Sequence, residues 1–180
     1  STVGPSASAL TYYLGDGSVT VDKDEERGTY SYQNKTDGRT ENVYVDEDTQ
    51  DNGQIIIKQA EGTTTNNTVT VEEDVTNDKG KRDVDIILDG VNVDTSDTST
   101  QTDTPTEVSA DTKEDKTIIK VGEGADVELT VMDSNLTTGG NGIDIGVNLK
   151  DDDDNKKTNV DLTLEDTNIN LTEKDNTAGI

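Results

Sequence analysis

The chain of 180 residues contains no cysteine, histidine, tryptophan or phenylalanine. Without cysteine it can form neither a disulfide nor a reactive thiolate. Without cysteine and histidine, the usual nucleophiles, bases and catalytic triads are missing. These absences predict that the protein is not an enzyme.

Basic charge and long apolar runs are also scarce. Lysine and arginine together number 15, against 40 aspartates and glutamates, which gives a formal net charge of −25. Binding to nucleic acid requires a basic surface, so nucleic acid is excluded as a partner. No stretch approaches the roughly 18 apolar residues of a membrane span. Such acidity is typical of extracellular or salt-exposed proteins and of proteins that bind cations.

Apolar residues make up only 27% of the chain, well below the roughly 45–50% of ordinary globular domains. This leaves either disorder or a fold with a thin core. Sustained alternation of valine, isoleucine and leucine favours the thin, repetitive core of a sheet-based solenoid. Helical periodicity is missing, and threonine, valine, asparagine, aspartate and glycine dominate, so we expect an all-β protein.

One phrase recurs three times, as "DVDIILDGVNV" (83–93), "DVELTVMDSNL" (126–136) and "NVDLTLEDTNI" (159–169). The copies align without a gap, with valine second, aliphatic residues fourth, sixth and eleventh, and asparagine tenth. Stacking the copies would set these aliphatic residues in continuous columns while the strands hydrogen-bond along the stack. The long connections between copies favour parallel pairing. The repeat therefore predicts a right-handed parallel β-helix, or solenoid. A β-sandwich or jelly roll is the alternative.

The recurring asparagines, Asn92, Asn135 and Asn168, occupy the same position in each copy. We expect them at a bend, with each side-chain amide bonded to the next in a ladder. Asparagine also tolerates the left-handed backbone conformation that a bend needs. The alternative is that each is an ordinary turn residue.

The repeats divide the chain into two segments. Within residues 53–180, each copy of the phrase has an upstream strand, in "NTVTV" (67–71), "KTIIKVGEGA" (116–125) and "GIDIGVNL" (142–149). Residues 1–52 carry no copy and contain all five tyrosines. We therefore predict a small N-terminal β cap or docking segment followed by β-helix repeats.

The phrases "GQIIIKQAEGTTTNNTVTVEEDV" (53–75), "DIILDGVNV" (85–93) and "IIKVGEGADVELTVMDSNLTTGGNGI" (118–143) resemble a repeat of large secreted or cell-surface proteins of gut Firmicutes. Those proteins are described as carbohydrate-binding-domain-containing or pectate-lyase-like. The resemblance covers about residues 53–180. It implies a right-handed β-helix, secretion and a role at the cell surface, but it assigns no binding residues.

Three acidic or glycine-rich stretches are candidate calcium sites. Asp46, Asp48 and Asp51 precede a glycine, in an arrangement similar to a loop that binds a hard cation. "GGNGIDIG" (139–146) matches most of a calcium-binding nonapeptide, and "DDDD" (151–154) is the third candidate. These stretches predict calcium as the candidate cofactor. The alternative for each is a solvated acidic turn.

A carbohydrate site would need an aromatic platform, and Tyr30 and Tyr32 alternate onto one face of a predicted strand. Together they could stack on a sugar ring. The alternative is that they pack over the first turn of the solenoid as part of a cap.

The third copy runs into "NTAGI" (176–180) without a polar terminal repeat. An open end exposes unpaired backbone and apolar side chains, which favours pairing with another chain. We therefore predict an extracellular structural or adhesive solenoid. Its partners would be itself, head to tail in a filament or stalk, or other components of the cell surface. A carbohydrate-binding module that recognises glycans is the alternative, and a polysaccharide-active enzyme is the third possibility.

Overall fold

The computed structural model describes residues 10–24, 29–34, 40–43, 54–75, 84–96, 116–146, 157–173 and 177–180. Within these residues the protein is all-β, as predicted, with one short 3₁₀ helix, η1 (Leu14–Asp16). The strands are β1 (Leu10–Tyr13), β2 (Val19–Asp24), β3 (Thr29–Asn34), β4 (Thr40–Val43), β5 (Ile55–Lys58), β6 (Val69–Val71), β7 (Val84–Asp89), β8 (Asn92–Asp94), β9 (Ile119–Val121), β10 (Asp126–Met132), β11 (Asn135–Thr138), β12 (Ile143–Ile145), β13 (Asn159–Glu165) and β14 (Asn168–Leu171).

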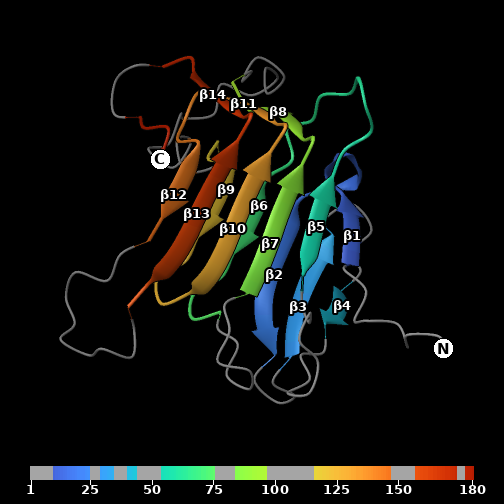
Figure 1. Ribbon diagram of the computed structural model, residues 1–180, viewed down its shortest axis with the longest axis vertical. Helices are drawn as coiled ribbons and strands as arrows, with labels where there is room; N and C mark the ends of the chain where they lie inside the picture. Colours follow the sequence, from blue (N-terminus) through green and yellow to red (C-terminus); the bar gives the residue numbers. More distant parts are fainter. Residues whose placement is uncertain are drawn as a thin grey trace, which may run out of the picture.

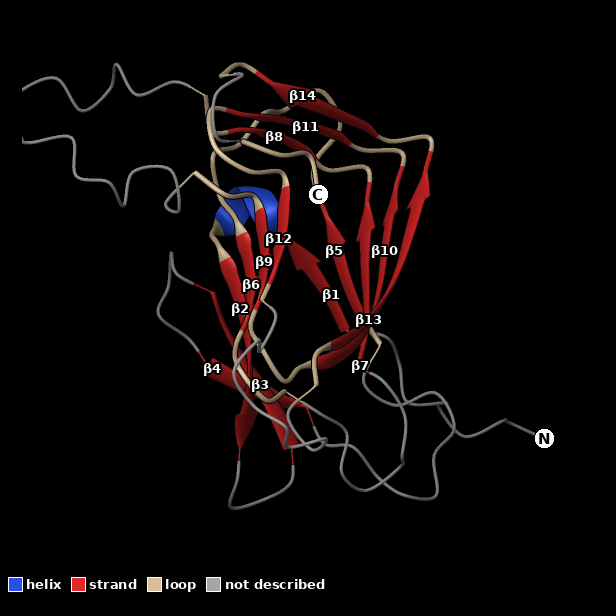
Figure 2. Cartoon of the chain, turned by 90° about the vertical axis from the view of Figure 1, so that its left-hand side faces the viewer, coloured by secondary structure: helices blue, strands red, loops and turns tan. Residues whose placement is uncertain are grey.

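The strands form three sheets that the chain visits in turn (Figure 1). Sheet A has the order β1-β5-β7-β10-β13, sheet B the order β12-β9-β6-β2-β3-β4, and sheet C the order β14-β11-β8. From β7 onward the chain passes from sheet A to sheet C to sheet B, and each such passage is called a circuit. Strands of successive circuits pair in parallel. Figure 2 shows the three sheets as three walls around a common interior.

The three repeated phrases lie side by side in sheets A and C. Val127 pairs with Val84 on one side and with Val160 on the other. The predicted stacking of equivalent aliphatic residues is thereby confirmed. The alternative of a β-sandwich or jelly roll does not fit, because those folds are built from antiparallel strands.

The first circuit lies inside the segment that was predicted to be a cap. β1 pairs in parallel with β5, and β2 pairs in parallel with β6. Only β3 and β4 depart from this pattern, since β3 adds to the edge of β2 in antiparallel orientation and β4 follows it. The predicted boundary between residues 52 and 53 therefore divides strands that share the same sheets. The sequence hid this circuit because "LTYY" carries tyrosines where the other copies carry aliphatic residues.

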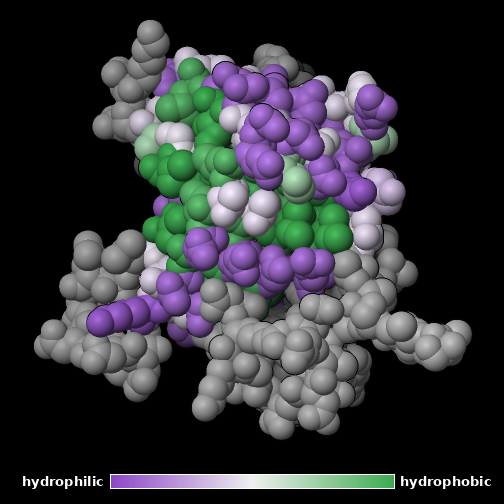
Figure 3. Space-filling view, in the orientation of Figure 1, coloured by the Kyte–Doolittle hydropathy of each residue, from purple (hydrophilic) through white to green (hydrophobic). Residues whose placement is uncertain are grey.

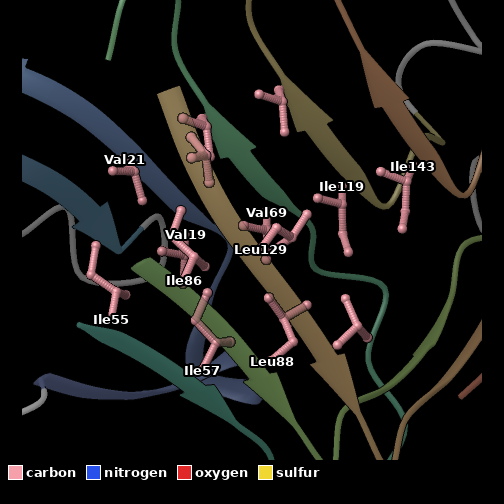
Figure 4. Packing of buried hydrophobic residues seen from close by; sticks show 14 of the residues in the cluster. Val19, Val21, Ile55, Ile57, Val69, Ile86, Leu88, Ile119, Leu129 and Ile143 are labelled. Atoms are coloured by element: carbon pink, nitrogen blue, oxygen red, sulfur yellow. The ribbon is translucent and has the colours of Figure 1, made fainter. Parts of the chain in front are cut away.

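The core is a set of aliphatic columns between the sheets. Figure 4 shows side chains of sheets A and B meeting in this interior. The buried apolar residues are Leu14, Val19, Val21, Ile55, Ile57, Val69, Val71, Val75, Val84, Ile86, Leu88, Val91, Val93, Ile118, Ile119, Val121, Ala125, Val127, Leu129, Val131, Leu136 and Ile143. Each wall contributes only every second residue of its strands. This explains how a chain with few apolar residues can fill a continuous core.

A left-handed residue turns the chain from sheet A to sheet C in three circuits. Gly90 has φ 72°, Asp133 has φ 49° and Asp166 has φ 47°. These residues lie two positions before the recurring asparagines, which begin β8, β11 and β14. The prediction that asparagine supplies the bend is therefore wrong. Glycine adopts this conformation without strain, and aspartate is one of the few other residues that tolerate it.

A glutamine side chain replaces part of a strand in the second circuit. There the chain contributes to sheet C only an isolated bridge between Thr65 and Val93. The Gln59 side chain fills the neighbouring position, because its Nε2 donates to the carbonyl oxygen of Asn92 at 3.0 Å. Its Oε1 accepts from the backbone N–H of Asn92 at 2.9 Å. The buried carboxamide thus bonds to Asn92 much as a peptide group of a neighbouring strand would.

Candidate interaction surface at the carboxy-terminal circuit

The last circuit consists of β13, β14 and residues 177–180. In the last of these segments, the carbonyl oxygens of Ala178 and Gly179 accept from the N–H groups of Gly142 and Ile143 at 3.0 and 2.8 Å. This segment therefore adds to the edge of β12. Among the described residues, no strand pairs with the outer edge of β13 or β14. Both edges present backbone groups that can bond to another strand.

The apolar columns are exposed at this circuit. In β10, Val127, Leu129 and Val131 are at most 1% exposed. Their partners in β13 are more open, since Leu164 is 39% exposed and Val160 and Leu162 are only half-buried. The residues keep the identity of a core position but lack a covering layer. Figure 3 shows apolar surface on the side of the molecule where β12 and β13 lie.

β13 also lacks the features that usually protect an edge strand. Natural edge strands carry inward-pointing charges, proline or a bulge that discourages further pairing. The residues of β13 that continue the core columns are Val160, Leu162 and Leu164, and the strand pairs with β10 over seven consecutive residues without a bulge. This edge is therefore a suitable surface for the addition of another β-strand.

The opposite end of the stack is covered. Leu14, Val19 and Val21, which line the first circuit, are at most 1% exposed. The outer edge of β2 is occupied by β3. The two ends of the molecule thus differ, and the candidate interaction surface belongs to the carboxy-terminal circuit alone.

The predicted asparagine ladder is stacked, but its amides bond elsewhere. Asn135 pairs in register with Asn92 and with Asn168 at the starts of β8, β11 and β14. The Nδ2 of Asn92 donates to Thr64 Oγ1 at 3.2 Å, and Oδ1 of Asn135 accepts from Nδ2 of Asn170 at 3.0 Å. The predicted register is confirmed, whereas the predicted amide-to-amide bonds between these three residues are not what the side chains form.

The other predicted site residues are not brought into the surface described above. Tyr30 and Tyr32 lie in β3, between β2 and β4. A carbohydrate site at these tyrosines stays a prediction. Asp46, Asp48 and Asp51 lie outside the described residues, so their proposed role as calcium ligands also stays a prediction.

The glycine-rich stretch at 139–146 has a packing role in the structure. A Cβ at Gly142 would lie 2.6 Å from the carbonyl oxygen of Gly179, and a Cβ at Gly146 would lie 2.9 Å from the backbone nitrogen of Glu123. Glycine is thus needed because neighbouring circuits approach closely at these corners. In the described part of the chain, no group of three or more acidic side chains is arranged to hold a metal ion. The "DDDD" stretch, 151–154, lies outside that part.

Sequence reasoning missed one component of the surface. The segment 177–180 contains alanine and glycine and has no strand-like alternation, so nothing in its composition marks it as the continuation of sheet B. The signal that could have found it is the equivalent corner one circuit earlier, where the N–H groups of Ile118 and Ile119 donate to Asn141 and Gly142. The same pattern recurs when Gly142 and Ile143 donate to the last segment.

Comparison with known protein families, characterised proteins and solved structures found no match for this chain. Among the described residues, no helix is both long and apolar enough to cross a membrane.

Proposed function

We propose that this protein is a structural and adhesive component of the cell exterior, built as a right-handed parallel β-helix. The observation that carries the proposal is sheet A, in which five parallel strands keep a continuous register from β1 to β13. Stacked circuits of this kind form a rod in which each circuit contacts its neighbours and the length grows with their number. The right hand is the one that about 98% of crossovers between parallel strands adopt.

The charge of the outer surface supports a location outside the cell. Asp85, Glu128 and Asp161 occupy one row across β7, β10 and β13, each directly opposite the next. Like charges at this spacing repel one another, and dissolved salt reduces the repulsion. A rod with such a face is suited to a salt-containing medium, and the resemblance to secreted repeats points to the same location.

Antibody labelling of producing cells tests the proposal. We expect antibodies against the chain to label intact cells, and we expect cells that lack the chain to attach less well to surfaces. Reintroducing the chain should restore attachment, whereas a chain with Leu129→Asp should not, because a charge at this buried position disrupts the stack. Thr130→Asp, on the outer face of the same strand, is the matched control. Labelling only after the cells are permeabilised would contradict the proposal.

A further inference from the structure

The two ends of the stack differ in what they can accept. A head-to-tail contact would require the first circuit of the next copy to be uncovered, yet Leu14, Val19 and Val21 are fully buried there and β3 occupies the edge of β2. The surface with exposed columns and free strand edges is the carboxy-terminal circuit. We propose that two copies of the chain join through their carboxy-terminal circuits, with β13 of one copy antiparallel to β13 of the other. This inference builds on the proposed structural function and gives the exposed circuit its partner.

A two-fold axis at Leu162 makes the two β13 strands complementary. It sets Leu162 opposite Leu162 of the second copy and Val160 opposite Leu164, so the apolar columns of both copies meet. On the outer face the same register sets Asp161 opposite Thr163 and Glu165 opposite Asn159. No carboxylate of β13 then lies directly opposite another, which avoids the pairing that destabilises adjacent strands. An isologous contact of this kind closes as a dimer and does not extend into a filament.

The other two sheets meet under the same symmetry. The described circuits have three walls, and an axis through the middle of sheet A exchanges sheets B and C between the copies. β14 of each copy would then face residues 177–180 of the other. Ile169, which is half-buried against the core from β14, would gain a covering layer at this contact. Each open edge of one copy therefore finds an open edge of the second.

The net charge of −25 on each chain opposes the contact and gives it a signature. Long-range repulsion between exposed charges weakens as the ionic strength rises, and burial of apolar surface remains. We therefore expect the dimer to be favoured by salt. An association driven by contacts between opposite charges would respond in the other direction.

A single engineered cysteine tests the contact directly, because the natural chain has none. In Leu162→Cys the two thiols would face each other across the axis, where directly opposed Cα atoms of antiparallel strands are about 4.5–5.5 Å apart. That separation lies within the range of disulfides, roughly 4.4–6.8 Å. We expect mild oxidation to give a covalent dimer of Leu162→Cys, whereas Thr130→Cys, on the inner strand β10, should remain monomeric and controls for random collision.

Two outcomes of the oxidation would overturn the inference. A head-to-tail arrangement would leave Leu162→Cys alone uncrosslinked and would join only the double variant Leu10→Cys/Leu162→Cys, into chains of more than two copies. Absence of any crosslink in these variants would show that the circuit does not bind a second copy. Either result would leave the surface labelling of intact cells unaffected, so the failure of this inference and of the proposed function can be told apart.

Sedimentation of a second pair of variants tests the register without relying on oxidation. Thr163→Lys places a positive charge opposite Asp161 of the other copy and should lower the dissociation constant several-fold. Thr163→Glu places like charges there and should raise it several-fold. Thr130→Lys and Thr130→Glu make the same changes one strand inward and should leave it within about two-fold. Equal effects at the two positions, or a monomer at all protein and salt concentrations, would overturn the inference.

Discussion

At the scale of single residues, one backbone position in each circuit decides how the chain turns out of sheet A. Gly90 occupies it in the third circuit with φ 72°, and aspartates occupy it in the next two. The sequence showed these residues in one column, but it did not show which member of the turn is left-handed. Asparagine and aspartate share the same local preferences, so their identity alone could not separate the bend residue from the strand residue two positions later.

Gly90→Ala should destabilise the protein through the backbone alone. No atom lies within 4 Å of the position that the new Cβ would take, so the change creates no clash, but the left-handed conformation is strained for alanine. We expect a loss of about 1 kcal/mol in the free energy of unfolding, measured with urea. Gly15→Ala is the matched control, because its Cβ would also meet no atom and its φ is not left-handed. Equal effects of the two substitutions would contradict this explanation.

Gln59→Leu should cost more than a surface glutamine does. The substitution keeps a similar volume but leaves the backbone N–H of Asn92 without its acceptor, and a buried unsatisfied group costs about 1–3 kcal/mol. Gln54→Leu removes a surface bond to the Asp85 carboxylate and should change the free energy of unfolding by less than about 1 kcal/mol. If thermal and urea unfolding show the same loss for both variants, Gln59 does not replace a strand as described.

At the scale of the strands, the sequence predicted β7, β10 and β13 together with their register, because alternation and repetition act in the same direction. It also predicted the upstream strands, and Val69, Ile119 and Ile143 do align in sheet B. It did not assign β1 and β5 to the same stack. β5 consists of three isoleucines and a lysine, and such a short apolar run does not reveal which of its faces is buried.

Truncation of the same column at two depths should measure how far each circuit is covered. Leu129 and Leu162 are direct partners in β10 and β13, but only Leu129 is fully buried. We expect Leu129→Ala to lower the free energy of unfolding by about 2–5 kcal/mol and Leu162→Ala by less than half of that. The comparison should be made at low protein concentration, where the carboxy-terminal circuit is not covered by a second copy. A larger loss at Leu162 would contradict the burial described for the two circuits.

At the scale of the whole molecule, a thin apolar core and a strongly acidic surface belong to one design. The core needs only alternate residues of each strand, which leaves the outward positions free to carry charge. The open end follows from the same repetition, because the last copy keeps the aliphatic residues of the inner ones. The sequence therefore predicted that one end would be apolar. It could not predict that the first circuit would be buried, since that depends on β3 adding to the edge of β2.

The central claim is that successive circuits stack in parallel and in register, and a disulfide trap tests it most directly. Thr130 and Thr163 are partners on the outer face of β10 and β13, and neighbouring strands lie about 4.8 Å apart. Oxidation of Thr130→Cys/Thr163→Cys should therefore give an intramolecular disulfide that peptide mapping detects. Thr11→Cys/Thr163→Cys joins positions on the first and last strands of sheet A and should stay reduced. A Thr130/Thr163 pair that stays reduced, or equal yields from both pairs, would contradict the stacked arrangement.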